Sequence, residues 1–171
     1  MAAGFAYTGG PRPIAYSAGG ELFVFLFFGL AAVTGSYYLQ TFVISLSALV
    51  VATGVGLVAS AVLLVNNYRD LESDRKARKL TLSHHLGRDN AQKLYALLLL
   101  LPFLVPLWPH LPQPGSWLAI LCLPWALRLV RRFFLEEPGP QFNQVLVQTA
   151  QLQLLYSILL STGLLVEILP Q

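Results

Sequence analysis

Residues 66–74 read NNYRDLESD and follow directly on a long apolar run, and this junction is the most informative part of the sequence. In it Asn66, Asp70 and Asp74 are spaced four residues apart. If a helix continues through Asn66 and Asp70, this spacing places an amide and two carboxylates on one face at the membrane edge. Carboxylates near hydrocarbon are costly unless they bind a cation or face water. We therefore expect the three side chains to point together into a cavity open to the cytoplasm and to bind Mg²⁺.

The composition indicates a membrane protein. Of the 171 residues 56% are apolar and 11% are charged, whereas soluble domains carry about 25% charged residues. A bilayer core of roughly 30 Å takes about 20 helical residues to cross. The sequence predicts an all-α fold, a polytopic transmembrane helix bundle that forms a single membrane domain over residues 1–171. The five predicted spans are 21–39, 42–65, 91–108, 116–133 and 145–169, and residues 66–93 form a cytoplasmic active-site loop.

Prolines interrupt two of these spans. Pro102 and Pro106 fall in the third span and Pro124 in the fourth. We expect kinks there, with polar side chains or neighbouring helices satisfying the carbonyls that the prolines leave free.

The basic residues test the segmentation independently. If the amino terminus is cytoplasmic, every Lys and Arg lies on one side of the membrane: before the first span, in residues 66–93, or at the end of the fourth span. The opposite loops at 40–41 and 109–115 carry none, as the positive-inside rule demands of short loops. The sequence therefore predicts a cytoplasmic amino terminus and a carboxyl terminus outside.

The loop at 66–93 combines acidic with basic side chains. The two aspartates are followed within two turns by Arg75, Lys76, Arg78 and Lys79. Acidic groups that hold Mg²⁺ beside basic groups that hold phosphate oxygens describe a diphosphate site. The alternative is a basic juxtamembrane loop that attracts anionic lipids. The spacing alone leaves both interpretations open.

Three separated parts of the chain resemble one family. Residues 66–75, with KLTL at 79–82 and LGR at 86–88, resemble the second aspartate-rich motif of the UbiA-type intramembrane prenyltransferases. More narrowly, they resemble the 1,4-dihydroxy-2-naphthoate polyprenyltransferases of menaquinone synthesis. YTGGPRPIAY at 7–16, GELFVFLFFG at 20–29 and QTAQL at 148–152 are similar to the same family. The resemblance implies the second half of that family's nine-helix fold, in a bacterial plasma (inner) membrane.

The resemblance also implies roles for single residues. Asn66, Asp70 and Asp74 would bind Mg²⁺ and, through it, the diphosphate of a polyprenyl donor, with Asp70 and Asp74 as the catalytic residues. Arg75 and Lys79 would contact phosphate oxygens. Arg12 is a further candidate for the diphosphate or for the carboxylate of the acceptor.

The chain departs from the family pattern in two short places. Arg78 stands where the family usually has Gly before the Lys, and SHH at 83–85 stands where Ala-Val-Arg is more typical. We expect a tighter turn at Arg78, and at His85 a charge that depends on pH rather than a permanent one.

A larger departure is that only the second aspartate-rich motif is present. We expect a chain that corresponds to the carboxyl-terminal half of the family fold, either a truncated enzyme that is inactive alone or one half of a split protein with an amino-terminal half as partner. The implied reaction transfers a polyprenyl group from polyprenyl diphosphate to 1,4-dihydroxy-2-naphthoate with loss of CO₂ and diphosphate, giving demethylmenaquinone. An inactive membrane fragment is the alternative. A cation transport protein is a third, although transport favours carboxylates near the bilayer midplane.

Two groups of polar residues outside this loop complete the expectations. Gln141, Gln144, Gln148 and Gln151 form a stripe at helical spacing, which predicts contacts between helices or with the acceptor. Arg128, Arg131 and Arg132 are expected to reach the cytoplasmic surface as orientation anchors.

Overall fold

The structure, a computed structural model, describes residue 9, residues 13–111 and residues 114–168. Every regular element in these residues is a helix, so the all-α bundle is confirmed. In chain order the elements are η1 (Ile14–Tyr16), α2 (Gly20–Val24), η2 (Phe25–Thr34), α3 (Gly35–Thr41), α4 (Leu46–Arg69), α5 (Leu71–Lys76), α6 (Leu82–Leu100), η3 (Leu101–Leu107), η4 (Gly115–Cys122), α7 (Leu123–Leu135) and α8 (Phe142–Ile168).

Four helical stretches are long and apolar enough to cross a membrane: Gly20–Thr41, Leu46–Arg69, Leu82–Leu107 and Phe142–Val166. They overlap four of the predicted spans, which makes the chain a multi-pass membrane protein, although the third begins at Leu82, inside the predicted loop 66–93. The second stretch begins at Leu46 rather than at 42, because Phe42 adopts a positive φ of 56° and ends α3. The predicted span 116–133 is helical as η4 and α7 but contains three arginines, so its crossing stays a prediction. The orientation of the termini also stays a prediction.

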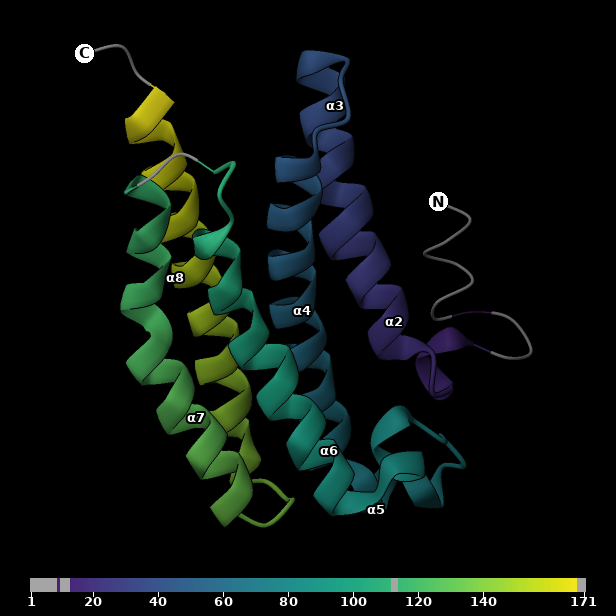
Figure 1. The fold of residues 1–171 in the computed structure, drawn as a ribbon. Helices are drawn as coiled ribbons and strands as arrows, with labels where there is room; N and C mark the ends of the chain where they lie inside the picture. The colour runs from purple at the N-terminus through teal and green to yellow at the C-terminus, as the bar shows by residue number, and fades with distance from the viewer. Residues whose placement is uncertain (1–8, 10–12, 112–113, 169–171) are drawn as a thin grey trace.

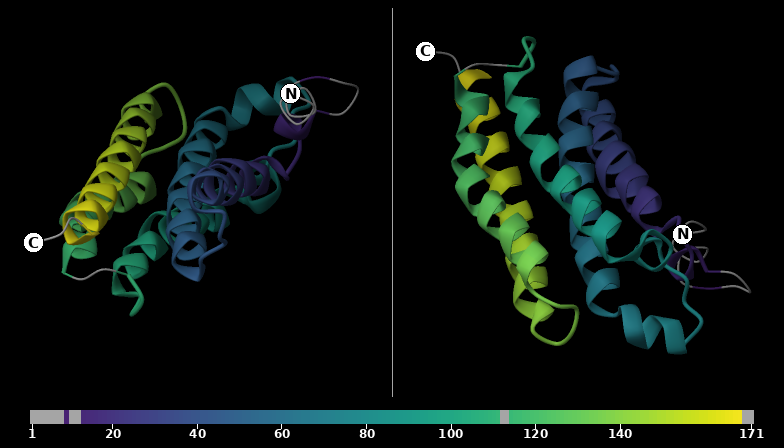
Figure 2. Two further views of the ribbon diagram at one scale, coloured as in Figure 1. Left: turned by 90° about the horizontal axis from the view of Figure 1, so that it is seen from above. Right: turned by 60° about the horizontal axis from the view of Figure 1, so that its bottom comes forward.

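Helix α4 lies in the middle of the bundle, between α2 and η2 on one side and α6 and α8 on the other (Figures 1 and 2). Its contact with η2 is one of backbone against backbone. A Cβ atom added to Gly29 would lie 2.5 Å from the Cα of Gly56, and one added to Gly56 would lie 2.9 Å from the Cα of Gly29. Small residues permit this approach. The approach also holds the start of α2 beside the last turns of α4.

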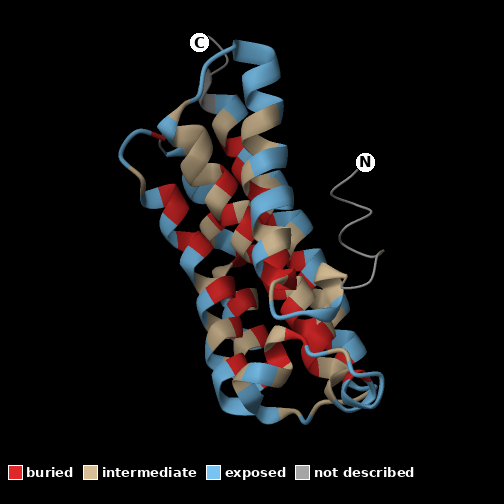
Figure 3. Cartoon of the chain, turned by 90° about the vertical axis from the view of Figure 1, so that its right-hand side faces the viewer, coloured by how far each residue is buried: buried red, intermediate tan, exposed pale blue. Residues whose placement is uncertain are grey.

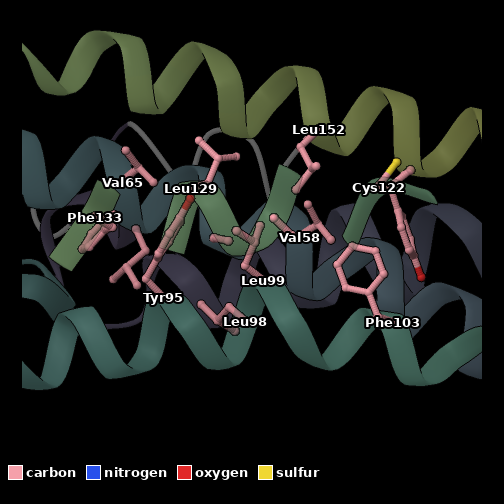
Figure 4. Close-up of a cluster of buried hydrophobic side chains, with 14 of the residues drawn as sticks. Val58, Val65, Tyr95, Leu98, Leu99, Phe103, Cys122, Leu129, Phe133 and Leu152 are labelled. Atoms are coloured by element: carbon pink, nitrogen blue, oxygen red, sulfur yellow. The ribbon is translucent and has the colours of Figure 1, made fainter. Parts of the chain in front are cut away.

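Large aromatic side chains fix the other side of α4. The ring centroid of Phe133 in α7 lies 4.1 Å from that of Tyr95 in α6, 4.5 Å from that of Tyr68 in α4 and 5.1 Å from that of Phe142 in α8. Figure 4 shows Tyr95 and Phe133 together in the apolar core. Buried residues lie where the helices meet, whereas the outer faces are exposed (Figure 3). This aromatic cluster packs three helices, α6, α7 and α8, against the end of α4, beside the polar stretch 66–74.

Around Pro102 and Pro106 the expected side-chain contacts with free carbonyls are present, whereas the expected kinks stay a prediction. Residues 101–107 form the 3₁₀ helix η3 in continuation of α6, and Pro106 has no N–H to offer to the preceding turn. The hydroxyl of Tyr156 in α8 donates to the Pro102 carbonyl at 2.8 Å, and the hydroxyl of Ser116 donates to the Pro106 carbonyl at 3.3 Å. Side chains from other segments thus satisfy these carbonyls.

Candidate functional site

The polar stretch at 66–74 bends where a straight helix is expected. Helix α4 includes Asn66 as predicted but ends at Arg69, and α5 begins at Leu71. Asp70 lies between them with φ of −94° and ψ of 11°. The helix therefore ends one residue before Asp70, through which it was predicted to continue. Regular helical spacing no longer sets the direction of the Asp74 side chain relative to that of Asn66.

Arg69 gathers Asn66 and Asp70 around its guanidinium, and we call these residues with Asn143 the Arg69 cluster. Nε and Nη2 of Arg69 donate to the two carboxylate oxygens of Asp70 at 2.8 and 2.6 Å. Nη2 also donates to Oδ1 of Asn66 at 3.0 Å, and Nη1 donates to Oδ1 of Asn143 in α8 at 2.7 Å. The last contact ties the end of α4 to the start of α8.

These contacts shape the electrostatics of Asp70. Hydrogen bonding to Arg69, the largest influence, holds the pKa of Asp70 below its ordinary value, while partial burial opposes it and the charges of Arg69 and Lys79 reinforce it. Asp70 therefore stays ionised at neutral pH. Beside the cluster opens a polar pocket of about 510 Å³, lined by Arg69, Asp70, Glu72, Ser73, Pro138, Gly139, Pro140 and Asn143.

Asp74 belongs to a second group, the Lys79 cluster, formed by Glu21, Asn67, Asp74 and Lys79. The ammonium Nζ of Lys79 lies 3.0 Å from Oδ2 of Asp74 and 3.5 Å from Oδ1 of Asn67. Nδ2 of Asn67 donates to Oε1 of Glu21 at 2.9 Å. The cluster joins α2, α4, α5 and the loop after α5. Asn67, and not Asn66, contacts the lysine.

A helix C-cap brings Lys79 back toward Asp74. The amide of Lys79 donates to the Asp74 carbonyl at 2.8 Å and the amide of Arg78 donates to the Arg75 carbonyl at 3.2 Å, which is the Schellman pattern. Arg78 takes the left-handed position with φ of 56°. This is the position where the family resemblance expects Gly, so a side chain stands where glycine is favoured.

The predicted residues are thus divided between two neighbouring clusters. Asn66 and Asp70 lie in one, and Asp74 and Lys79 in the other. The hydrogen bonds do not gather Asn66, Asp70 and Asp74 on one face. Arg75 is exposed on α5, and Arg12 lies outside the described residues. The two clusters are close enough for the charge of Lys79 to act on Asp70.

The donor set fits a magnesium ion in part. In the described residues no group of three His, Cys, Asp or Glu side chains is close enough to hold a metal ion. Asn66 and Asp70 nevertheless converge on one cationic group, the guanidinium of Arg69, and offer hard oxygen donors. Mg²⁺ is commonly bound through one or two carboxylates together with substrate phosphates. Their chemistry therefore fits Mg²⁺ when phosphate oxygens complete the coordination.

Four residues of these clusters were not predicted: Glu21, Asn67, Arg69 and Asn143. A carboxylate at the start of an apolar span was a usable signal for Glu21. Asn67 and Arg69 lie within the motif but between the residues spaced by four. Asn143 carries no local signal, since its contact with Arg69 joins positions 74 residues apart.

Two of the four glutamines of the stripe, Gln144 and Gln148, contact another helix, whereas Gln141 bonds to the Glu137 carbonyl and Gln151 is exposed. Nη1 of Arg132 in α7 donates to Oε1 of Gln148 in α8 at 2.9 Å, and Nη2 donates to Oε1 of Gln144 at 3.4 Å. Arg132 also pairs with Glu136, at 2.7 Å between Nε and Oε1. Arg132 therefore links α7 to α8, a role beyond that of a surface anchor.

Comparison with known proteins identifies the family of this chain. The sequence matches the UbiA prenyltransferase family over residues 1–157. It is 36% identical over 169 residues to the 1,4-dihydroxy-2-naphthoate octaprenyltransferase of Haemophilus influenzae, an overlap of 97% of this chain and 55% of that protein. It is 34% identical over 172 residues to the protein of the same name in Escherichia coli, covering 95% of this chain and 54% of that one.

A human relative shows the same extent of overlap. UbiA prenyltransferase domain-containing protein 1 is 35% identical over 167 residues, which are 96% of this chain and 48% of that protein. The chain thus spans about half the length of the curated relatives it matches. Since the family match covers all but the last residues, the chain belongs to the UbiA prenyltransferase family.

Proposed function

We propose that this chain serves the transfer of a polyprenyl group from polyprenyl diphosphate to 1,4-dihydroxy-2-naphthoate, with loss of CO₂ and diphosphate. The observation that carries the proposal is the pair of acidic and basic clusters at one end of an apolar bundle, around the joint of α4 and α5. The names of the bacterial relatives support the choice of substrates.

The proposed reaction exchanges one bond for another. The C–O bond between the prenyl group and the diphosphate breaks, and its electron pair leaves with the diphosphate. The ring carbon that bears the carboxylate forms the new C–C bond to the prenyl group. Loss of CO₂ then returns an electron pair to the ring, which gives the quinol form of demethylmenaquinone.

The residues of this chain would act on the departing diphosphate. Lys79, whose side chain is 19% exposed, and Arg75 would bind its oxygens as charge develops on them. Asn66 and Asp70, joined by Asp74 from the neighbouring Lys79 cluster, would hold Mg²⁺, which supplies neutralisation of the leaving group when bound. Arg12 stays a candidate contact for the diphosphate or for the acceptor carboxylate.

We further propose that catalysis needs helices beyond this chain. The relatives are about twice as long, and a cavity closed on one side only neither orients two substrates nor excludes water. An amino-terminal half with its own aspartate-rich motif is the proposed partner.

A chimera tests the proposal. Residues 1–171 replace the region they match in the Haemophilus influenzae relative, and membranes with the chimera, or with the chain alone, receive Mg²⁺, octaprenyl diphosphate and 1,4-dihydroxy-2-naphthoate. We expect prenylated product, measured by mass spectrometry, from the chimera and not from the chain alone. A folded, membrane-inserted chimera without product would contradict the proposed function. Product from the chain alone would contradict the need for a second half.

A further inference from the structure

Glu21 is a carboxyl residue buried at the start of the first span. It is only 3% exposed, and its backbone carbonyl accepts a hydrogen bond from the hydroxyl of Ser60 in α4 at 2.9 Å. Its Oε1 accepts the hydrogen bond from Asn67, while its buried Oε2 has no hydrogen-bond partner among the described residues. A carboxyl group placed in an apolar bundle is expensive, so its position calls for an explanation.

The neighbouring amide supplies that explanation. Asn67 is also 3% exposed and uses both ends of its side chain. Its Nδ2 donates to Glu21, which leaves Oδ1 facing the ammonium of Lys79 at 3.5 Å. Without Glu21 the Nδ2 group of Asn67 would lose its acceptor, and only the long contact of Oδ1 with Lys79 would hold the amide in place. The orientation of Asn67 thus depends on Glu21.

We propose that Glu21 is a positioning residue that acts through Asn67 to set the place of the Lys79 ammonium at the diphosphate site. This inference rests on the proposed function only for the identity of the ligand that Lys79 binds, a diphosphate. Glu21 lies on α2 and Lys79 lies after α5, and Asn67 at the end of α4 joins them. The geometry couples the first span to the loop that carries the cation. Without Glu21, Asp74 alone holds the lysine, at 3.0 Å.

The reactivity of Lys79 measures this coupling. The purified chain in detergent is acylated briefly with acetic anhydride, and mass spectrometry gives the modification of Lys79 relative to the exposed Lys76 and Lys93. Glu21→Leu should raise this ratio about twofold, the low end for loss of a hydrogen bond, because the contact of Lys79 with Asn67 is long at 3.5 Å. Asn67→Leu should have the same effect, which provides a second variant if Glu21→Leu does not fold.

Two variants separate positioning from general stability. Glu21→Gln keeps an oxygen that accepts from Asn67, and the Oε2 position has no hydrogen bond to lose, so the ratio should stay at the wild-type value. Ser60→Ala removes a buried hydrogen bond to the same residue without touching its carboxyl group, and it should also leave the ratio unchanged. The proposal would be overturned if Glu21→Leu and Asn67→Leu left the ratio at its wild-type value. It would also be overturned if acylation rose equally at Lys76, Lys79 and Lys93.

A further arm tests the ligand separately. Inorganic pyrophosphate with Mg²⁺ should lower the acylation of Lys79 in the wild-type chain. If Glu21→Leu raises the ratio but pyrophosphate gives no protection, the positioning role stands and the diphosphate site fails. If pyrophosphate protects Lys79 equally in the wild type and in Glu21→Leu, with equal ratios, the diphosphate site stands and the positioning role fails.

Discussion

Helix α4 is held in two different ways along its length. Between Ala52 and Gly56 it meets η2 through small residues, and the contact of Gly29 with Gly56 leaves no room for a methyl group. From Asn66 onward Tyr68 still packs in the aromatic cluster, but the polar side chains meet charged groups, and Arg69 and Lys79 pair with Asp70 and Asp74. The first region depends on shape, whereas the second depends on charge. A change of volume should therefore damage the first region most, and a change of charge the second.

The largest expected effect is on activity at the charged joint. In the chimera, Asp70→Asn or Asp74→Asn should lower kcat by about 100-fold or more with little change in the KM for the prenyl donor, because neutralisation matters most as charge develops on the leaving group. Steady-state kinetics in membranes measure both constants. Asp89→Asn, at an exposed position of α6, is the matched control and should stay active.

Lys79→Ala should show the opposite kinetic pattern in the same assay. Loss of a direct phosphate contact should raise the donor KM more than it lowers kcat. If a variant with both Asp70 and Asp74 replaced showed wild-type kinetics, the assigned catalytic roles would be wrong. The charged residues between α4 and α5 would then have a structural role only.

The next effect is on stability in the region of small residues. Gly29→Ala places a Cβ atom 2.5 Å from the Cα of Gly56 and 2.8 Å from the Ala52 carbonyl oxygen, so the two backbones must move apart. The free energy of unfolding in detergent should fall by about 2 kcal/mol. Gly35→Ala in the same continuous helix is the control, because its added Cβ meets nothing within 4 Å. Equal stabilities of the two variants would show that the helices do not depend on this close approach.

A smaller effect of the opposite sign is expected at Arg78. This residue occupies the left-handed position of the C-cap with φ of 56°, which favours glycine. Arg78→Gly should therefore raise the free energy of unfolding by about 1 kcal/mol. Arg75→Gly, inside α5, should lower it instead. Destabilisation by Arg78→Gly would mean that the arginine side chain makes a contact worth more than the backbone strain.

The two regions also differ in how far the sequence predicts them. Long apolar runs predict helices well, since a bilayer forces the backbone to satisfy its hydrogen bonds within each span. The same requirement explains why Tyr156 donates a hydrogen bond to the Pro102 carbonyl. The sequence predicts that a polar side chain or a neighbouring helix satisfies such a carbonyl, but it does not identify Tyr156. The replacement of a family glycine by Arg78 predicts a tighter turn, but not the left-handed conformation that Arg78 adopts there.

The arrangement at the joint was less predictable, because contacts between distant segments decide it. A spacing of four residues implies one face only while the helix continues, and α4 ends at Arg69, whose guanidinium reaches Asn143 of α8. Lys79 meets Asn67 because the chain turns back after α5. Glu21 was counted as the first residue of an apolar span, although a buried carboxyl group there signals a polar partner.

The smallest effect concerns the ionisation of Asp70. Its pKa is lowered in the folded chain, mainly by hydrogen bonding to Arg69, so its contribution to stability is complete above the unfolded pKa of about 3.9 and is lost as pH falls through the lower, folded value. Asp70→Asn removes this contribution. The wild type should exceed Asp70→Asn in free energy of unfolding by about 1 kcal/mol or less at pH 6, because the Asp70 and Arg69 side chains are 31% and 22% exposed. The difference should shrink steadily below about pH 4, as measured by unfolding in detergent across this range. A stability difference that stays constant down to the lowest pH measured would mean that the amide of Asn packs less well than the carboxylate because of its shape. The distinction between a region held by charge and a region held by volume would then fail at Asp70.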